Sequence, residues 1–218
     1  MQLTDKLNLT NEDNMELMAR YPDKYFSLAI CDPPYGIGFS DYERGSSGIK
    51  VKERYTKNGK KDLDKEIPTD EYFNELKRVS KNQIVWGGNY FPELWLNGCK
   101  GFIFWYKHQP VNNFAKGELA WTSFNTPAQC FDFMYYGNLN RDLVQLHPTQ
   151  KPVALYKWLL DKYAKEGYKI IDTHLGSMSI AIACHDYGFE LTGCELDPEY
   201  YERGIQRVKN HISQLKLF

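Results

Sequence analysis

Several features that mark common protein classes are scarce or missing in this chain of 218 residues. Its 27 Lys and Arg nearly balance its 28 Asp and Glu, and the formal charge of −1 excludes a protein that binds nucleic acid through bulk positive charge. No apolar run approaches the roughly 20 residues of a membrane span, and residues 1–13 show no signal-peptide pattern. The sequence therefore predicts a soluble, cytoplasmic protein with no membrane contact.

Metal-binding and redox patterns are also missing. The cysteines are odd in number and widely spaced, without a CxxC pair, which favours reduced thiols over a zinc ribbon or a redox site. The histidines show no ligand spacing such as HExxH, so we expect no metal. The five cysteines are Cys31, Cys99, Cys130, Cys184 and Cys194.

The composition is that of a folded domain. Hydrophobic residues make up 42% of the chain and aromatic residues 15%, enough to fill a substantial core. This excludes disordered and collagen-like proteins, and there is no internal repeat or low-complexity tract. We expect one domain over residues 1–218.

Strand-like and helix-like segments alternate along the chain. Short apolar or aromatic runs predict strands, and apolar residues every three or four positions predict helices. This alternation indicates an α/β sandwich with a mostly parallel sheet. The predicted strands are 25–31, 83–86, 101–106, 129–136, 168–172 and 189–195. The predicted helices are 10–20, capped by Thr10, others beginning near residues 68, 152 and 197, and 177–187.

One stretch, at about residues 40–66, departs from this pattern. Between Arg44 and Lys61 there are seven basic residues and one acidic residue, a net charge of +6, among Gly and Ser with few apolar neighbours. Such a composition predicts a mobile basic loop rather than core. Its basic residues include Arg44, Lys50, Lys52, Arg54 and Lys57.

A stiff turn follows the strand predicted at 25–31. Two prolines directly after a strand allow neither helix nor sheet to continue, so they fix the carboxylate before them and the aromatic ring after them. Both groups then lie beyond the carboxyl end of a strand, where open α/β sheets keep their sites. The turn consists of Asp32, Pro33, Pro34 and Tyr35.

A second constellation lies near the carboxyl terminus. A strand ending at Asp172, a turn with Gly176, a helix, and a strand ending at Glu195 form a nucleotide-binding βαβ unit. Glu195 follows Gly176 by 19 positions, the spacing of an acid that binds ribose hydroxyls.

These motifs resemble those of the amino-methylating DNA methyltransferases, whose catalytic motif is (D/N/S)-P-P-Y. Residues 172–177 read D-T-H-L-G-S and are similar to the family's cofactor motif D-P-F-x-G-S-G. Residues 147–152 read H-P-T-Q-K-P and are similar to a segment that precedes that motif, and residues 195–200 look like its acidic strand end. The catalytic motif comes first in the chain, as in a permuted subgroup of the family.

The resemblance implies a Rossmann-like methyltransferase fold and S-adenosylmethionine as cofactor. Thr173, His174 and Met178 depart from the family pattern. Met178 stands where a second glycine is usual, which argues against a pyrophosphate ligand, and S-adenosylmethionine has no phosphate. Lys151 is a suitable partner for the cofactor carboxylate, and Asp172 for its ammonium. The residues predicted to bind the cofactor are Cys31, Asp32, Lys151, Asp172, His174, Gly176, Ser177, Glu195 and Leu196.

The implied reaction is methylation of an exocyclic amine in double-stranded DNA. The Asp32 carboxylate and the Pro33 carbonyl accept the amine hydrogens, so that the nitrogen lone pair faces the methyl donor. Pro34 stiffens the turn, and Tyr35 stacks on the flipped base. Asp as the first motif residue favours adenine N6, with cytosine N4 as the alternative. Restriction–modification is the biological setting that the family suggests.

The resemblance also assigns DNA contacts and leaves other functions open. The basic loop closes over DNA phosphates, and about residues 107–146 form a small target-recognition region. We expect a monomer or homodimer that associates with the nucleoid when bound to DNA. The alternatives are a DNA-binding relative that has lost turnover, and a methyltransferase acting on RNA or on a protein glutamine.

Overall fold

The computed structural model describes residues 2–37, 67–110, 115–135, 146 and 150–214. The predicted basic loop lies outside the described residues, and so do residues 111–114 and 136–145 of the predicted target-recognition region. The DNA contacts assigned to the loop therefore stay predictions. The residues concerned are Arg44, Lys50, Lys52, Arg54 and Lys57.

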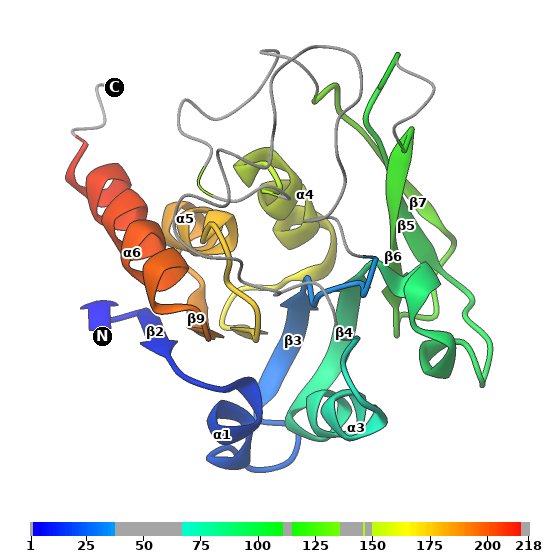
Figure 1. Ribbon diagram of the computed structural model, residues 1–218, viewed down its shortest axis with the longest axis horizontal. Helices are drawn as coiled ribbons and strands as arrows, with labels where there is room; N and C mark the ends of the chain where they lie inside the picture. Colours follow the sequence, from blue (N-terminus) through cyan, green and yellow to red (C-terminus); the bar gives the residue numbers. More distant parts are fainter. Residues whose placement is uncertain (1, 38–66, 111–114, 136–145, 147–149, 215–218) are drawn as a thin grey trace.

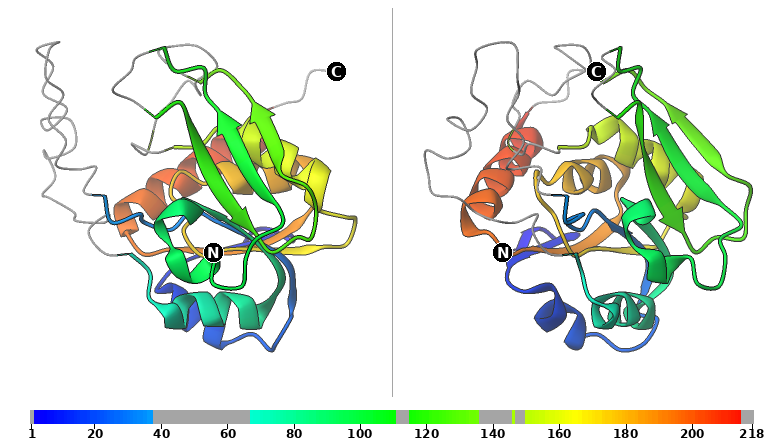
Figure 2. Two further views of the ribbon diagram at one scale, coloured as in Figure 1. Left: turned by 90° about the vertical axis from the view of Figure 1, so that its right-hand side faces the viewer. Right: turned by 45° about the vertical axis from the view of Figure 1, so that its right-hand side comes forward.

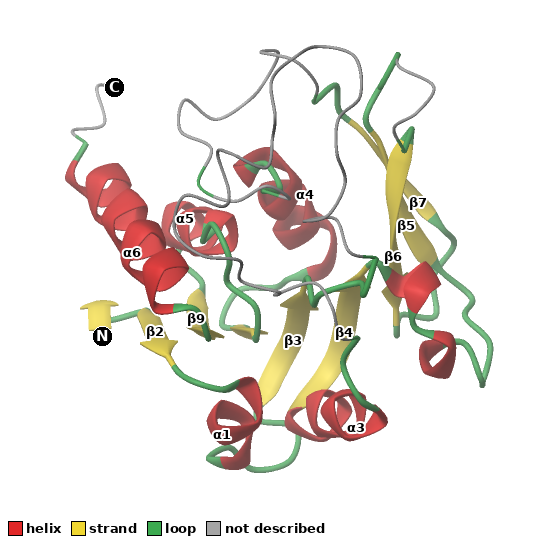
Figure 3. Cartoon of the chain, in the orientation of Figure 1, coloured by secondary structure: helices red, strands yellow, loops and turns green. Residues whose placement is uncertain are grey.

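Nine strands of the described residues form one sheet. They are β1 (Gln2–Thr4), β2 (Leu7–Asn11), β3 (Phe26–Cys31), β4 (Ser80–Trp86), β5 (Phe102–Tyr106), β6 (Gly117–Thr122), β7 (Gln129–Asp132), β8 (Lys169–Asp172) and β9 (Glu190–Glu195). The order is β1-β2-β9-β8-β3-β4-β6-β5-β7, and Figure 3 labels all of these strands except β1 and β8. The run from β2 to β4 is parallel, whereas β6 is antiparallel to both of its neighbours. The predicted mostly parallel sheet is confirmed.

Helices cover both faces of this sheet (Figures 1 and 2). On one face lie α1 (Asn14–Ala19) and α3 (Asp70–Val79), and on the other lie α4 (Val153–Tyr163), α5 (Ser179–Tyr187) and α6 (Pro198–Ser213). Among the described residues, no helix combines the length and apolar character that a membrane crossing needs.

After the two central strands, β8 and β3, the chain continues to strands on opposite sides of this pair in the sheet. From β8 it passes through α5 to β9, whereas from β3 it passes through α3 to β4 on the other side. The sheet order therefore reverses between β8 and β3, which pair in parallel with Leu28 opposite Ile170 and Ala29 opposite Ile171. At such a switch point the two crossovers diverge and leave a crevice at the carboxyl ends of the strands.

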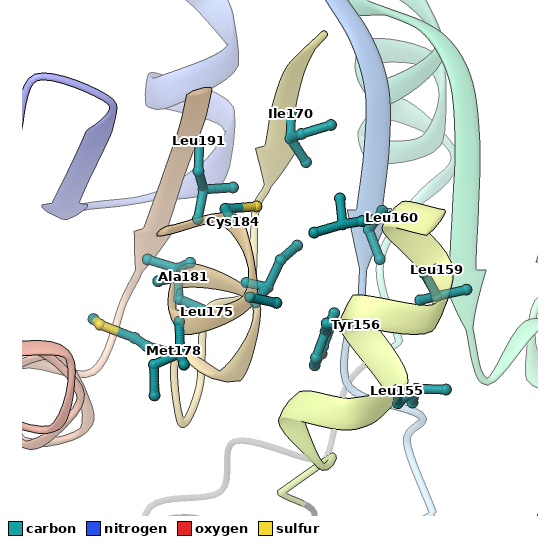
Figure 4. Close-up of a cluster of buried hydrophobic side chains, with 14 of the residues drawn as sticks. Leu155, Tyr156, Leu159, Leu160, Ile170, Leu175, Met178, Ala181, Cys184 and Leu191 are labelled. Carbon is teal, nitrogen blue, oxygen red and sulfur yellow. The ribbon is translucent and has the colours of Figure 1, made fainter. Parts of the chain in front are cut away.

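The central strands are buried on both faces, as parallel strands usually are. Leu28 of β3 and Ile170 of β8 belong to the core under α4 and α5, where Ile170 packs with Leu160 and Cys184 (Figure 4). Ala29 of β3 belongs to a second core, under α1 and α3. The continuous apolar character of these strands follows from this double coverage, because alternate side chains enter different cores.

The predicted start of the first helix is wrong. Thr10 does not cap a helix: it lies in β2, which pairs with β9 and buries Leu7 and Leu9 in alternation. The helix begins later, and Asp13 caps it by accepting a hydrogen bond from the backbone N–H of Met15 at 2.7 Å. Strand pairing therefore outweighs the helix pattern of the first predicted residues.

The middle of the chain holds a strand that the sequence did not predict. Residues 117–122, expected to connect two strands, form β6 between β4 and β5. The polar start at Gly117 and Glu118 hides the apolar run that follows it. Two other predicted elements are too long, because β7 ends at Asp132 and α5 begins at Ser179.

Candidate active site

Three carboxylates meet at the carboxyl ends of three neighbouring strands. Asp32 directly follows β3, Asp172 ends β8, and Glu195 ends β9. The register places Asp172 opposite Gly193, two residues before Glu195. The fold thus brings together two motifs that are distant in the sequence, at the ends of the adjacent strands β3 and β8.

The turn after β3 is rigidly packed. Pro33 is buried, and the Tyr35 hydroxyl donates a hydrogen bond to Asp32 Oδ1 at 2.6 Å. The Tyr35 ring lies so close to Gly87 that a Cβ added there would come within 2.1 Å of the ring. Tyr90, in the short 3-10 helix η2 (Gly88–Tyr90), stacks on the same ring with centroids 5.1 Å apart. Carboxylate and ring therefore form one fixed unit.

Lys151 completes this unit from another part of the chain. Its side chain is only 2% exposed, and its ammonium forms an ion pair with Asp32 and donates a hydrogen bond to the Tyr35 hydroxyl at 3.1 Å. Burial lowers the pKa of Lys151, but Asp32 and Glu118 more than offset this and leave it above its ordinary value. The cofactor contact predicted for Lys151 stays a prediction, and its contact with Asp32 was not foreseen.

Glu118 of β6 is a site residue that sequence reasoning missed. Its carboxylate makes ion pairs with Lys107 and, at 3.3 Å, with Lys151. Burial alone raises the pKa of Glu118, but these two cations outweigh it and lower the pKa to about 2. An acid placed just before the apolar run of residues 119–121 was the available signal, but only the structure shows that this segment is a strand.

Asp172 lies in an acidic and buried environment. It is 1% exposed and accepts a hydrogen bond from the His174 backbone N–H at 2.9 Å. Burial, with Asp32 and Glu195 nearby, raises the pKa of Asp172 to about 8. Burial lowers the pKa of the neighbouring His174 to about 4, so this imidazole is neutral at physiological pH. A ligand cation would stabilise the ionised form of Asp172.

The residues that depart from the family pattern have defined contacts. Thr173 is buried and shares a hydrogen bond with the Tyr72 hydroxyl at 2.6 Å. His174 Nε2 lies 3.2 Å from Asn14 Nδ2, at the start of α1. Met178 takes the left-handed conformation that a glycine would adopt, with φ of 58°. The turn between β8 and α5 is thus held by α1, by α3 and by its own backbone.

Glu195 closes the other side of this turn. Its two carboxylate oxygens accept hydrogen bonds from the backbone N–H groups of Gly176, at 2.8 Å, and Asp197, at 3.0 Å. The next residue, Leu196, is 62% exposed. The Ser177 hydroxyl faces Ser179 at 3.2 Å. Glu195 therefore joins the two loops that border the strand ends.

The charge balance favours a cationic ligand. Asp32, Asp172 and Glu195 lie at the ends of neighbouring strands, whereas Lys151 is shared between Asp32 and Glu118. Within the described part of the chain, no group of three or more His, Cys, Asp or Glu is arranged to hold a metal ion. An organic cation with hydroxyl groups matches these carboxylates.

Sheet order, switch point and strand-end acids define an α/β methyltransferase fold. A family profile described as DNA methylase, of the N6/N4 type, matches residues 53–206. The chain belongs to this DNA methyltransferase family.

Individual relatives agree with this assignment. The chain is 26% identical to the putative methylase YubD of Escherichia coli (strain K12), over 90% of this chain and 87% of that protein. Its fold is similar to that of M1.HpyAVI in complex with SAM, with a TM-score of 0.59, 15% identity and coverage of 95% of this chain and 100% of the other. It is also similar to the cytosine-N4-specific PvuII DNA methyltransferase, with a TM-score of 0.61, 12% identity and coverage of 96% and 93%.

Replacing Gly87 tests how tightly the Tyr35 ring is held. Gly87 has a φ of +69°, and Gly87→Ala also places a methyl group against the ring. Gly167→Ala is a matched control, because Gly167 has a φ of +80° and nothing within 4 Å of the added Cβ. We expect about 1 kcal/mol of destabilisation for Gly167→Ala and about 2–4 kcal/mol for Gly87→Ala in urea unfolding. Equal losses would show that the ring moves aside freely.

The raised pKa of Asp172 predicts a pH-dependent stability. Between pH 6.5 and 8 the folded protein holds a proton on Asp172 that the unfolded chain has released, so the free energy of unfolding falls as pH rises. The fall is at most about 1.4 kcal/mol per pH unit. Asp172→Asn keeps an acceptor for the His174 N–H but does not titrate, and we expect a flatter profile in urea unfolding across this range. A profile as steep as that of the wild type would contradict the assignment.

Proposed function

We propose that this protein transfers a methyl group from S-adenosylmethionine to the exocyclic amine of a flipped DNA base, adenine N6 in the first instance. The observation that carries the proposal is the position of Asp32 and Asp172 at the carboxyl ends of two adjacent strands, at the point where the sheet order reverses. One carboxylate faces the acceptor amine, and the other belongs to the cofactor side.

The residues present fit S-adenosylmethionine. Burial, and then its acidic neighbours, raise the pKa of Asp172, so a cofactor ammonium beside it would stabilise the ionised carboxylate. Glu195 carries carboxylate lone pairs for ribose hydroxyls beyond those used by its two backbone donors. Exposed Leu196 offers apolar surface for the adenine ring. His174, Gly176, Ser177 and Cys31 border the same turn, and Lys151 remains a candidate for the cofactor carboxylate.

The chain's own residues prepare the acceptor amine. Asp32 and the Pro33 carbonyl accept its hydrogens, and the fixed turn holds these acceptors in place before the base arrives. Tyr35, locked against Gly87, offers a ring on which the flipped base stacks. S-adenosylmethionine, when bound, supplies the electrophilic methyl group. The nearly dry surroundings of Lys151 strengthen the charge interactions around Asp32.

The choice of adenine over cytosine rests on the catalytic motif, and cytosine is the alternative. Asp as the first motif residue favours adenine, whereas the structural likeness to the cytosine-N4-specific PvuII enzyme favours cytosine. Both amines present the same chemical problem, because each lone pair is delocalised into its ring. The products, N6-methyladenine and N4-methylcytosine, differ and can be separated after digestion of the DNA.

The test measures transfer from tritiated S-adenosylmethionine into unmethylated duplex DNA, RNA and protein in parallel, followed by nucleoside analysis. We expect label in DNA, as N6-methyladenine. Asp32→Ala should lower the rate by at least about 100-fold while cofactor affinity changes little, because Asp32 acts on the amine. Asp161→Ala, an exposed aspartate on α4, serves as the control and should match the wild type.

Other results identify the competing functions. Label in N4-methylcytosine would assign the chain to the cytosine-specific enzymes, and label in RNA or protein would replace DNA as substrate. DNA binding without transfer to any acceptor would show a relative that has lost turnover. Equal loss of transfer and of cofactor binding in Asp32→Ala would overturn the division of roles between the two strand ends.

Glu195 should act mainly on cofactor affinity. Glu195→Ala removes the carboxylate and frees the backbone N–H groups of Gly176 and Asp197, so we expect S-adenosylmethionine to bind about 10- to 100-fold more weakly in calorimetric titration. Glu199→Ala, on the first turn of α6, removes an acid four positions away that pairs with Arg203 at 3.8 Å. Unchanged affinity in Glu195→Ala, or an equal loss in Glu199→Ala, would remove Glu195 from the cofactor site.

A further inference from the structure

The carboxylate of Glu118 lies in an unusual position for an acid on a strand. Its Oε2 atom is buried and makes no hydrogen bond within the described part of the chain, and Lys151 Nζ is 3.3 Å away. Burying a carboxylate costs several kcal/mol unless cations compensate. The compensation here comes from Lys107 on one side and Lys151 on the other.

These residues continue into the proposed catalytic carboxylate. Lys107, Glu118, Lys151 and Asp32 form a row of alternating charges, in which each inner group touches two partners of opposite sign. Lys107 sits at the outer end, 20% exposed and over the Trp105 ring at 4.5 Å. Lys151, at 2% exposure, has two carboxylates and the Tyr35 hydroxyl as partners. The Lys151 charge is therefore divided between Glu118 and Asp32.

We propose that Glu118 is a positioning residue: by attracting Lys151, it limits how strongly Lys151 neutralises the Asp32 carboxylate. Lys107, at the outer end of the row, weakens the attraction of Glu118 for Lys151. The inference rests on the proposed function, in which Asp32 accepts hydrogens from the base amine. A carboxylate fully neutralised by an ammonium is a weaker acceptor for a neutral N–H donor. By attracting Lys151, Glu118 keeps Asp32 a strong acceptor while Lys151 still fixes its orientation.

Three other titratable residues lie near the Asp32–Lys151 pair, and they are present in the wild type and in each variant at 118 and 107. Tyr35 and Tyr156 face the pair, and burial raises the pKa of both well above the ordinary value, so they stay neutral. Asp172 faces Asp32 from β8. Differences between variants at 118 and 107 therefore report the row of charges itself.

Charge reasoning predicts opposite effects for the two ends of the row. Glu118→Gln removes a negative charge, which leaves Lys151 wholly to Asp32 and stabilises the Asp32 carboxylate. Lys107→Met removes a positive charge but keeps the apolar stem over Trp105, which leaves Glu118 free to attract Lys151 and makes Asp32 easier to protonate. If the row only anchored β6 to residue 151, both variants would be less stable and Asp32 would titrate alike in both.

The first measurement needs no activity. The ¹³C carboxyl signal of Asp32, identified by its absence in Asp32→Asn, is followed from pH 8 downward in protein labelled with [¹³C]aspartate. We expect the titration curve to lie roughly 0.5–1 pH unit lower in Glu118→Gln and higher in Lys107→Met than in the wild type. The controls are Glu190→Gln and Lys81→Met, exposed residues near the amino ends of β9 and β4, which should superimpose on the wild type.

The second measurement is methyl transfer. We expect kcat to fall about tenfold in Glu118→Gln with KM for the cofactor unchanged, and the acid limb of the pH–rate profile to move in the same direction as the Asp32 curve in each variant. Asp32 curves that shift in the same direction in both variants, or in neither, would overturn the inference. If Glu118→Gln does not fold, the Asp32 curve of Lys107→Met decides, and a curve that is not higher than that of the wild type would overturn the inference. A wild type that transfers no methyl group overturns the proposed function, whereas the order of the Asp32 curves still tests the row of charges.

Discussion

The parallel pairing of β3 with β8 is the constraint on which the site depends. Each strand carries one sequence motif at its carboxyl end. The pairing of Leu28 with Ile170 and of Ala29 with Ile171 fixes how the two motifs lie relative to each other. Because α3 and α5 lie on opposite faces of the sheet, the carboxyl ends of β3 and β8 lie at the switch point where open α/β sheets keep their sites. A shift of one residue in this pairing would turn alternate side chains into the opposite core. The packing of both cores therefore also holds the site in register.

Three acids at one edge of the sheet repel each other and are partly desolvated, and two kinds of group in the fold offset this. Backbone N–H groups of the following turns stabilise Glu195 and Asp172, and the buried ammonium of Lys151 stabilises Asp32. The compensation is incomplete at Asp172, whose pKa stays at about 8. A cationic cofactor would stabilise the ionised form of this buried acid, and the same unfavourable ionisation lowers the stability of the ligand-free protein at neutral pH.

The parts of the fold that the sequence predicted are those whose signal is local. The strands ending at Cys31, Asp172 and Glu195 are short apolar runs followed by turn residues, and their motifs lie at the strand ends. β6 was not predicted, because its polar start looks like a loop and its pairing with β4 is a long-range property. For the same reason Glu118 was missed: its meaning depends on Lys151, which belongs to a distant segment.

The departure from the family pattern at Met178 also has a long-range explanation. A non-glycine residue in the left-handed region costs about 1–2 kcal/mol, and burying a methionine side chain returns roughly 1.5–3 kcal/mol. Met178 is fully buried and packs on Gly204 of α6, where an added Cβ would come within 2.8 Å of Met178 Cγ. The methionine in the turn thus requires a glycine at position 204 of α6, because a larger residue there would collide with the Met178 side chain. Since the turn keeps the left-handed step, the substitution does not by itself remove the conditions for cofactor binding, and the Met178 departure gives little support to the interpretation of a relative that has lost turnover.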